Sequence, residues 1–414
     1  MWLMLEISRD LLLILKTFIL SFAAELFKNL WRFLVPTYKD LSNDVILITG
    51  AGAGIGRLMC LEFAQYCPTL IGLDVNKDTL NETARAVARL GGPVLRTYRD
   101  AVTSRSRDDI NQTVARVLRE VGRVTILVNN AGVVSGKQIL DLKPVDIDDT
   151  FQVNVISHIY MLQALLPSMM GSDGRVGDVV GSSDSVPRGH IVTIASLASV
   201  IPNPGLADYC ASKAAALMLS DALELELRVA NLEKHIHVTR VCPFFINTQM
   251  FEGCSSSNQP QFISSEASLL PSDGHTHCVI RFKVKQTPWK SQVPGAHCNL
   301  SCMALLIDSD ILPPSDGCTL LFRSRLSWLF PVVDADYCVR QIVKAVRANE
   351  RLVFIHRWQF LVAVLYWIVP RNTIYRLFDL CGTSQFVSQL QEHRKSKQEG
   401  TTSALPSAQL PPSE

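Results

Sequence analysis

Short apolar runs alternate with longer amphipathic stretches along the chain from Asp44 onward. Continuous apolar runs separated by helical patterns are typical of a parallel β-sheet that is covered by helices on both faces. The pattern therefore predicts an α/β domain over residues 44–386, built on a doubly wound parallel sheet. The expected strands are VILIT (45–49), TLIGLD (69–74), VLRTY (94–98), VTILVNN (124–130), HIVTIAS (190–196), HVTRVCP (237–243) and RLVFI (351–355).

Two stretches interrupt this rhythm and are interpreted as inserts. Gly171–Arg188 is dense in Gly, Ser and Asp just before a strand, which is typical of a loop. Residues 254–325 mix Ser, Pro, Cys and His without sustained periodicity, although CVIRFKV (278–284) has the pattern of a strand. A stretch of this length is expected to be a functional lid, a disordered segment or translated intron. The polar tail 391–414 is predicted to be disordered.

Leu11–Phe27 is a strongly apolar segment near the start of the chain. A spanning helix needs about 20 apolar residues, so residues 1–35 are predicted to form a marginal membrane anchor or a helix lying in the membrane interface. An ordinary buried helix is the alternative. Lys28 and Arg32 follow the segment, whereas Arg9 is the one basic residue before it. This excess of positive charge after the segment predicts that the following domain faces the cytosol.

A second apolar run, Phe360–Val369, is too short to span a membrane. Its length suits either a helix in the protein core or a second contact with the same membrane leaflet. Trp358, Tyr366 and Trp367 favour the membrane contact, because indole and phenol rings prefer the headgroup boundary. The sequence therefore predicts two membrane contacts, one near each end of the domain.

Charge and cysteine usage exclude several classes of partner. The chain has 40 basic and 38 acidic residues, a formal net charge of +2, and no long basic run, so nucleic acid is not an expected partner. Eleven cysteines occur without CxxC spacing, which favours free thiols in a reducing compartment. The His and Cys residues between 275 and 302 match no compact zinc site, so no metal is predicted.

A glycine-rich turn follows the first expected strand and reads TGAGAGIG over residues 49–56. Glycines allow the backbone to approach a pyrophosphate, and the amino terminus of the next helix, expected near Arg57, supplies free N–H groups and a positive dipole end. The turn predicts dinucleotide binding on a Rossmann fold, with a purely structural tight turn as the alternative. The expected cofactor-binding residues here are Thr49, Gly50, Gly54, Ile55 and Gly56.

Asp74 ends the second expected strand, 18 residues after Gly56. A carboxylate at this distance can accept hydrogen bonds from the adenosine ribose hydroxyls. It would repel a 2′-phosphate, and neither the glycine-rich turn nor Val75 and Asn76 supplies an arginine that compensates for that charge. The sequence therefore favours NAD as the cofactor, with NADP as the alternative.

Tyr209 and Lys213 lie four residues apart in YCASK, at the start of a helical pattern that runs to Leu227. The spacing places both side chains on one helix face. An ammonium group near a phenol favours the phenolate and lowers a phenol pKa from about 10, towards the range useful for general acid and base catalysis. The pair is a candidate proton-transfer site.

Together these motifs resemble the short-chain dehydrogenase/reductase family over residues 44–250 and 328–386. The chain has the family's glycine-rich turn, the NNAG motif (129–132), a serine 13 residues before the tyrosine, and YxxxK. The resemblance implies that Tyr209 exchanges a proton with the substrate oxygen and that Ser196 hydrogen-bonds that oxygen, with Ser199 as a competing hydroxyl. It also implies that Lys213 holds the nicotinamide ribose and that Asn154 positions a water in a proton relay.

The same resemblance assigns further residues to the cofactor cleft. It implies that Asn129, Ala131 and Gly132 line the cleft and that Thr248 contacts the nicotinamide carboxamide. Phe244 departs from the family pattern, because glycine usually follows the proline at that position. The Asp-Val pair that usually faces the adenine is offset by one residue in Asp100-Ala101-Val102.

A narrower resemblance is to the membrane-bound retinol dehydrogenases of the 16C type. It is carried by LVNNAGVVSG (127–136), DYCASK (208–213), MFEGC (250–254) and DYCVRQ (336–341). The resemblance implies oxidation of a lipophilic alcohol, first all-trans-retinol to retinal, with a steroid (17β-hydroxysteroid) as the alternative substrate. A catalytically weak lipid-binding membrane protein is the alternative from another class. The implied location is the endoplasmic reticulum membrane or the lipid droplet, and a homo-oligomer is an open alternative to a monomer.

Overall fold

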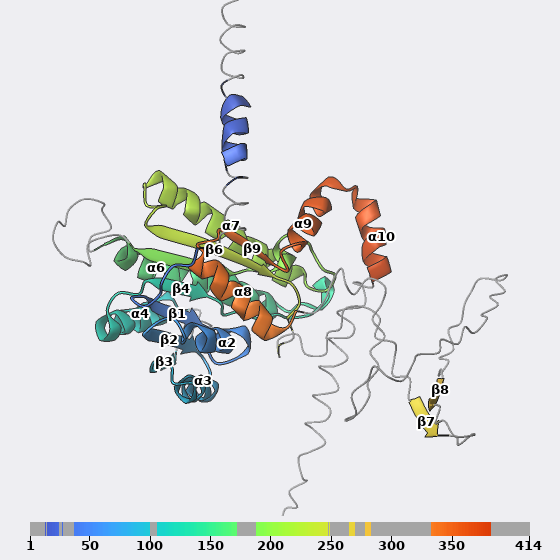
Figure 1. The fold of residues 1–414 in the computed structure, drawn as a ribbon, viewed down its shortest axis with the longest axis horizontal. Helices are drawn as coiled ribbons and strands as arrows, with labels where there is room; N and C mark the ends of the chain where they lie inside the picture. Colours follow the sequence, from blue (N-terminus) through green and yellow to red (C-terminus); the bar gives the residue numbers. More distant parts are fainter. Residues whose placement is uncertain are drawn as a thin grey trace, which may run out of the picture.

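A seven-stranded parallel sheet forms the centre of the molecule (Figure 1). The computed structural model describes residues 13, 15–24, 27, 37–99, 106–171, 188–246, 248, 265–269, 278–282 and 333–381. The strand order is β3-β2-β1-β4-β5-β6-β9, which confirms the predicted doubly wound sheet. The strands are β1 (Val45–Thr49), β2 (Thr69–Asp74), β3 (Leu95–Arg99), β4 (Ile126–Asn129), β5 (Gly189–Ile194), β6 (Ile236–Pro243) and β9 (Leu352–Ile355).

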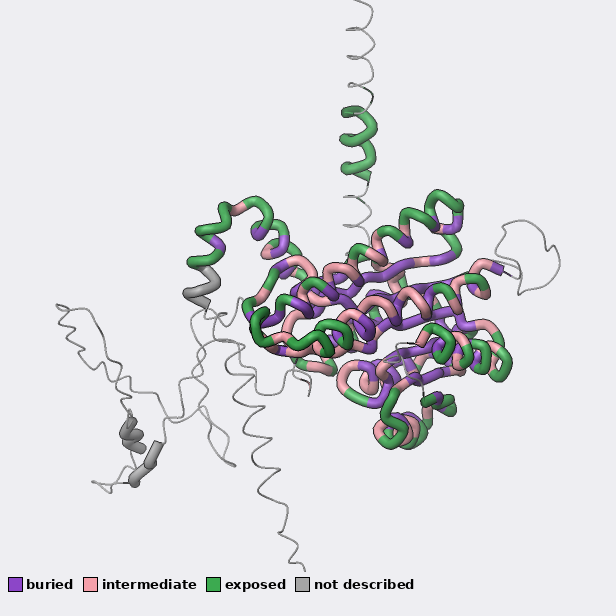
Figure 2. Tube along the Cα trace, turned by 180° about the vertical axis from the view of Figure 1, so that it is seen from behind, coloured by how far each residue is buried: buried purple, intermediate pink, exposed green. Residues whose placement is uncertain are grey.

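Helices cover both faces of the sheet and bury the strands between them (Figure 2). One face packs against α2 (Gly54–Phe63), α3 (Lys77–Arg89) and α8 (Ala335–Arg347). The other packs against α4 (Arg107–Val121), α6 (Ser157–Met170) and α7 (Ala207–Val229). The remaining described helical elements are η1 (Ile139–Asp141), α5 (Pro144–Phe151), the π-helix η2 (Gln152–Ile156), η3 (Leu197–Ser199), α9 (Gln359–Ile368) and α10 (Arg371–Cys381).

Burial on both faces explains why the strands are apolar without interruption. In β1, Ile46 and Ile48 pack on the α2 side, whereas Leu47 packs on the α4 side. Strand β4 repeats the arrangement, with Val128 on the first side and Leu127 on the second. Successive side chains of a strand point to opposite faces of the sheet. Because both faces are covered here, both sets of alternate positions must be apolar.

The strand order also creates a crevice. β1 pairs with β2 on one side and with β4 on the other, so the connections that leave β1 and β4 turn away from each other. Ligands of doubly wound sheets bind at this kind of reversal, beyond the carboxyl ends of the strands. Thr49, Asn129, Ile194 and Pro243 are the last residues of four central strands and mark that edge.

Part of the second insert is described as an antiparallel hairpin of β7 (Ser265–Leu269) and β8 (Cys278–Phe282). The hairpin confirms the strand expected at 278–284. The predicted loop over residues 172–187, the rest of the second insert, the tail 391–414 and the Asp100–Val102 segment lie outside the described residues.

Two short apolar helices, Leu15–Ala24 and α9, carry exposed hydrophobic side chains. The helix at Leu15–Ala24 stands apart from the body in Figure 1, and its Phe18 and Phe22 are exposed. Of the described part of the chain, Pro144–Met170 alone has the length and hydropathy of a membrane span. Because 44% of its most apolar window is buried and it packs against α4, that helix belongs to the protein core.

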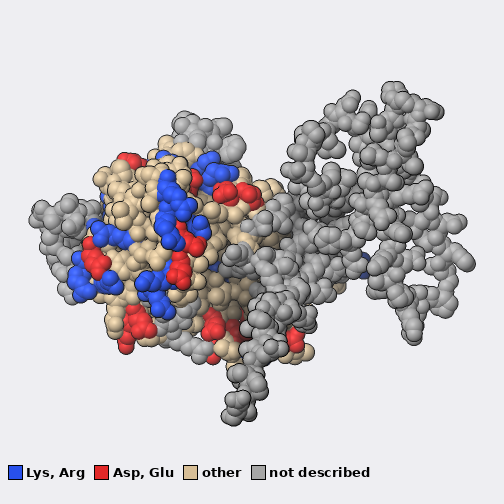
Figure 3. Space-filling view, turned by 90° about the horizontal axis from the view of Figure 1, so that it is seen from below, with Lys and Arg blue, Asp and Glu red and all other residues tan. Residues whose placement is uncertain are grey.

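Basic and acidic side chains are mixed on the face of the body shown in Figure 3. Opposite charges also pair among the described residues, as Arg116 does with Glu120 and Arg357 with Glu350. A face with interspersed charges creates no single-sign field. The surface in this view is consistent with the near-neutral composition of the chain.

Candidate active site

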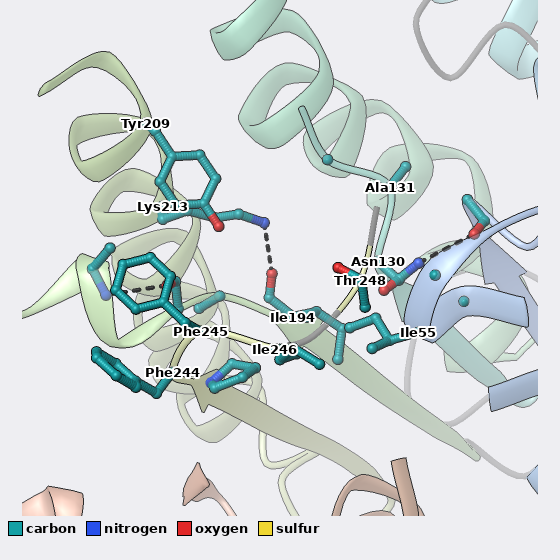
Figure 4. A pocket seen from close by; sticks show the side chains of 18 of the residues that line it. Ile55, Asn130, Ala131, Ile194, Tyr209, Lys213, Phe244, Phe245, Ile246 and Thr248 are labelled. Atoms are coloured by element: carbon teal, nitrogen blue, oxygen red, sulfur yellow. Dashed lines mark hydrogen bonds between the residues drawn. The ribbon is translucent and has the colours of Figure 1, made fainter. Parts of the chain in front are cut away.

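A cavity of about 240 Å³ opens at the carboxyl ends of β1, β4, β5 and β6 (Figure 4). Tyr209 and Lys213 project into it from α7, whereas Ile55 and Asn130 lie at its opposite end. Phe244 and Phe245 form another part of the wall. The cavity therefore joins the glycine-rich turn to the Tyr/Lys pair.

The glycine-rich turn packs so closely on itself and on the loop after β4 that side chains are excluded. A methyl group at Gly56 would lie 1.9 Å from the carbonyl oxygen of Gly50, and one at Gly50 would lie 3.0 Å from Ala131 Cα. Gly50 and Gly54 have φ values of +67° and +53°, which favour glycine. Helix α2 begins at Gly54, earlier than expected, and its N-cap Ala53 makes no side-chain hydrogen bond. The first N–H groups of the helix thus remain available to a phosphate, so the turn fits a dinucleotide.

Thr49 and Asn130 join the glycine-rich turn to the loop after β4. Thr49 Oγ1 accepts hydrogen bonds from Asn130 N and from Ala131 N, both at 3.0 Å. Asn130 Nδ2 donates to the carbonyl oxygen of Thr49 at 2.8 Å. Asn130 lines the cavity, whereas Asn129 is buried in β4 and is not part of the cavity wall. Sequence reasoning thus missed Asn130, although it stands in the same NNAG motif.

Asp74 lies in the cavity wall at the end of β2, next to the glycine-rich turn. Its Oδ2 accepts a hydrogen bond from Gly52 N at 2.8 Å, and its Oδ1 accepts one from Asn76 N at 2.9 Å. These bonds fix the carboxylate and leave each oxygen able to accept another donor. No arginine is among the described residues that line the cavity. This end of the cavity therefore suits ribose hydroxyls better than a phosphate.

The proton-transfer candidates meet at the start of α7. Tyr209 and Lys213 lie on one face of this helix and are both buried. The hydroxyl groups of Ser196 and Tyr209 are hydrogen-bonded, which brings β5 and α7 together at the substrate position. Ser196 Oγ also accepts from Ala198 N at 3.1 Å, whereas Ser199 Oγ accepts from Ser196 N at 3.3 Å. Ser196 rather than Ser199 is the hydroxyl that lines the cavity.

The pKa of Tyr209 beside Lys213 differs from the one expected from the sequence. Burial raises the pKa of Tyr209 above its usual value, and the hydrogen bond from Ser196 opposes this effect. Lys213 Nζ lies 5.9 Å from the centre of the Tyr209 ring and donates to the carbonyl oxygen of Ile194 at 2.9 Å. Burial lowers the pKa of Lys213 to about 8. The ammonium thus stands beside the ring, and the expected lowering of the phenol pKa by Lys213 is not found.

Asn154 lies in the π-helix η2, directly before α6. Its Oδ1 accepts from Val133 N at 2.8 Å, and its Nδ2 donates to Val133 O at 3.0 Å and to Ser212 Oγ at 2.9 Å. A methyl group at Gly132 would lie 3.3 Å from both Asn154 Oδ1 and Lys213 Nζ. The structure therefore brings Asn154 close to Lys213, although Asn154 is fully buried and does not line the cavity.

The remaining wall follows β6. Thr248 lines the cavity opposite Gly54, where a methyl group on the glycine would lie 4.0 Å from Thr248 Cβ. The rings of Phe244 and Phe245 are 4.6 Å apart in an edge-to-face arrangement. Phe245 also packs against the buried cluster of Ala198, Leu206 and Tyr209. Phe244, which stands where glycine usually follows the proline, thus adds a second aromatic ring to the cavity wall.

Several known proteins are similar to this chain in sequence. A family model described as short chain dehydrogenase matches residues 44–259. The chain is 36% identical over 252 residues to epidermal retinol dehydrogenase 2 of Mus musculus, covering 61% of this chain and 75% of that protein. It is 33% identical over 404 residues to retinol dehydrogenase 10 of Homo sapiens, covering 89% and 93%. It is 37% identical over 256 residues to estradiol 17-beta-dehydrogenase 11 of Macaca fascicularis, covering 62% and 78%.

A buried Tyr/Lys pair beside a dinucleotide cleft defines an NAD(P)-dependent oxidoreductase. The chain belongs to the short chain dehydrogenase family. Its relatives include retinol and estradiol dehydrogenases by name. The class of reaction is thus established.

Proposed function

We propose that this protein oxidises a lipophilic alcohol with NAD as the hydride acceptor. The first candidate reaction is the oxidation of all-trans-retinol to retinal. The observation that carries the proposal is the apolar surrounding of the reacting groups, because Tyr209 forms a buried cluster with Ala198 and Leu206, and Phe245 packs against that cluster. An apolar wall removes water from a hydrocarbon substrate while Ser196 and Tyr209 hold its one oxygen. The retinol dehydrogenases among the relatives support this choice.

The residues act on the substrate oxygen in a fixed order. The Ser196 and Tyr209 hydroxyls, which share a hydrogen bond, can both bind that oxygen. Tyr209 takes the alcohol proton onto its phenol oxygen once its own hydroxyl proton has left along the Lys213–Asn154 relay, and Ser196 stabilises the partial charge that develops on the substrate oxygen. Lys213, held by Ile194 O, is placed to bind ribose hydroxyls with its remaining donors and to return the proton towards Asn154. When bound, the nicotinamide supplies the acceptor for the hydride.

A steroid alcohol is the second candidate, because an estradiol dehydrogenase is as similar in sequence as the retinol dehydrogenase of mouse. Steady-state assays of the full chain in detergent or lipid, with NAD and either all-trans-retinol or estradiol, distinguish the two. We expect the larger kcat/KM for retinol. A larger value for estradiol would replace the first proposal with the second. Binding of either lipid without turnover would identify a lipid-binding protein.

NAD should be preferred over NADP because the fixed carboxylate of Asp74 meets the adenosine ribose. We expect kcat/KM to be larger for NAD by at least about tenfold, the effect of roughly 1.4 kcal/mol of like-charge repulsion. Asp74→Asn keeps an acceptor for Gly52 N and removes the charge. It should therefore lower the ratio of kcat/KM with NAD to kcat/KM with NADP. Asp78→Asn, an equal charge change on the exposed start of α3, is the control. An NADP preference in the unaltered protein would refute the argument.

We further propose that the chain attaches to the endoplasmic reticulum membrane, or to the lipid droplet, through two contacts and that the catalytic domain faces the cytosol. Helix α9 supports the second contact, because Ala363 and Tyr366 pack on the core while Leu361, Leu365 and Trp367 are exposed. A helix with one buried face and one exposed apolar face has the form of an interfacial helix. The exposed helix at Leu15–Ala24 supports the first contact.

Deleting residues 1–35 should leave a folded protein that still sediments in part with membranes. Adding Leu361→Asp and Trp367→Asp to the deletion should release it, because charges on the lipid-facing side of α9 oppose insertion. Val94→Asp, at an exposed apolar position on another surface, is the matched control. If the protein that lacks residues 1–35 is wholly soluble in flotation assays, α9 makes no membrane contact.

A further inference from the structure

A second cavity, of about 720 Å³, opens at the other edge of the sheet, beside the amino ends of β6 and β9. Its wall begins with Thr37, directly after the predicted anchor segment 1–35. The rest of the wall comes from the end of α7, the start of β6 and the end of α8. The wall includes four Lys or Arg and two Glu side chains, which are Lys39, Lys234, Arg347, Arg351, Glu224 and Glu233.

Lys39 is held in this wall without a carboxylate partner among the described residues. Its Nζ donates to His190 Nδ1 at 2.9 Å, and His190 Nε2 lies 2.8 Å from Thr239 Oγ1. Asp44, whose charge acts on the pKa of Lys39, is bound to Arg188 at 2.9 Å. Burial lowers the pKa of Lys39 to about 8, because neutral groups compensate its charge only weakly. Two N–H donors of the ammonium are left for a ligand.

Arg347 is fixed beside Lys39 at the end of α8. Its guanidinium lies 4.2 Å from the centre of the Tyr66 ring and 5.3 Å from that of Tyr38. Its Nε donates to the carbonyl oxygen of Lys39 at 3.4 Å, and Lys39 N donates to the carbonyl oxygen of Arg347 at 2.7 Å. Aromatic rings and the backbone thus hold this cation as well. Two cations that are already ordered lose little side-chain entropy when an anion binds.

The two carboxylates of the wall differ in their partners. Glu224 is bound to Arg240 at 2.7 Å and to Arg351 at 3.0 Å, so its charge is compensated. Glu233 takes part in neither ion pair, and its Oε2 is buried without a hydrogen-bond partner among the described residues. A buried carboxylate oxygen of this kind needs a donor. The cavity therefore combines two cations that lack an anion with one anion that lacks a cation.

The location of the cavity favours a membrane lipid as the source of these charges. Two residues of extended chain reach at most about 7 Å, so Thr37 stays close to the end of the anchor segment 1–35. The headgroup layer on each side of a bilayer is about 5 to 8 Å thick. An anchor that enters the leaflet therefore brings the cavity to the headgroups. Apolar side chains that can contact a glycerol backbone also line it, namely Leu227, Ile236 and Val238.

We propose that this cavity binds the headgroup of a phospholipid that carries a primary ammonium, such as phosphoethanolamine. Lys39 and Arg347 bind the phosphate, and Glu233 binds the ammonium. A headgroup held in this way fixes the orientation of the domain relative to the bilayer. The inference rests on the proposed membrane attachment through residues 1–35, although headgroup binding can be measured without a bilayer.

The test titrates the full chain in a maltoside detergent with dihexanoyl-phosphatidylethanolamine and measures the dissociation constant by calorimetry. Lys39→Gln and Arg347→Gln should each raise this constant by at least about tenfold, because each removes a charge-assisted hydrogen bond to the phosphate. Lys344→Gln, an equal charge change at an exposed position of α8, is the control and should bind as the unaltered protein does. Equal weakening in Lys344→Gln would overturn the proposal.

A comparison of ligands on the unaltered protein needs no variant. Dihexanoyl-phosphatidylcholine has the same charges but no N–H donor, so it should bind at least about tenfold more weakly than the ethanolamine lipid. Glu233→Gln should reduce this difference. Equal affinity for the two lipids in the unaltered protein would show that no ammonium is recognised, and the proposal would be wrong.

Free phosphoethanolamine distinguishes a lipid from a soluble ligand. It should bind more weakly than the lipid, because it makes no contact with the apolar part of the wall. Equal binding would refute the membrane source. NADH binding shows whether the variants are folded, since the active-site cavity lies at the opposite edge of the sheet. If a variant does not bind NADH, the ligand comparison decides alone. Failure of the chain to float with membranes would refute the attachment and leave the titration unchanged.

Discussion

Tyr209→Phe is expected to lower kcat by about 10²- to 10⁴-fold, the usual contribution of one general acid or base. The substitution deletes the oxygen that exchanges the proton with the substrate. The phenyl ring stays among Ala198, Leu206 and Phe245, so the packing of α7 is retained. The dissociation constant for NADH should therefore stay within about twofold, as expected when only a group that acts in the transition state is lost.

Tyr160→Phe is the matched control, because Tyr160 is a partly buried tyrosine on α6 that packs with the apolar side chains on that face. It should retain the turnover of the unaltered protein. Single-turnover measurements with retinol separate hydride transfer from product release. Turnover by Tyr209→Phe close to that of the control would show that another group moves the proton, and the mechanism would then be wrong.

Gly56→Ala is expected to abolish measurable NADH binding. The added methyl group would lie 1.9 Å from the carbonyl oxygen of Gly50, and a backbone atom cannot move aside as a flexible side chain could. The glycine-rich turn and the start of α2 must then separate, which displaces the N–H groups that would hold the pyrophosphate. The overpacking itself should also lower the free energy of unfolding by about 1 to 3 kcal/mol.

Fluorescence titration with NADH and urea unfolding measure the two effects separately. Gly91→Asn is the control, since Gly91 has a φ of +71°, open space around it, and a place after α3 where asparagine tolerates the left-handed backbone. It should bind NADH normally. NADH binding by Gly56→Ala within tenfold of this control would show that the glycine-rich turn does not hold the pyrophosphate.

The fold could be predicted because a strand that is buried on both faces of a sheet is apolar at every position. VILIT and TLIGLD coincide with β1 and β2 residue for residue, since both faces of each strand contact helices. The boundaries of β4 and the start of α2 were less accurate. The expected strand 124–130 is longer than Ile126–Asn129, because pairing at the ends of a strand depends on the neighbouring strands as well as on side-chain type.

The placement of candidate site residues could be predicted where local geometry determines it. A four-residue spacing in one helix brings Tyr209 and Lys213 to one face, and a strand that ends opposite the helix brings Ser196 to Tyr209. The roles of these residues remain predictions. The sequence contained no sign that Lys213 would donate to Ile194 O, or that burial would raise the pKa of Tyr209, because both depend on distant segments.

The double acceptor role of Thr49 has a consequence for the thermodynamics of cofactor binding. Its hydroxyl accepts hydrogen bonds from the backbone of Asn130 and Ala131, and its carbonyl accepts one from the side-chain amide of Asn130. The loops that follow β1 and β4 are therefore held together before a ligand binds. Loops that are already ordered lose little conformational entropy when a ligand binds. The dinucleotide should therefore bind by lock and key, at a rate set by diffusion into the cleft rather than by a folding step.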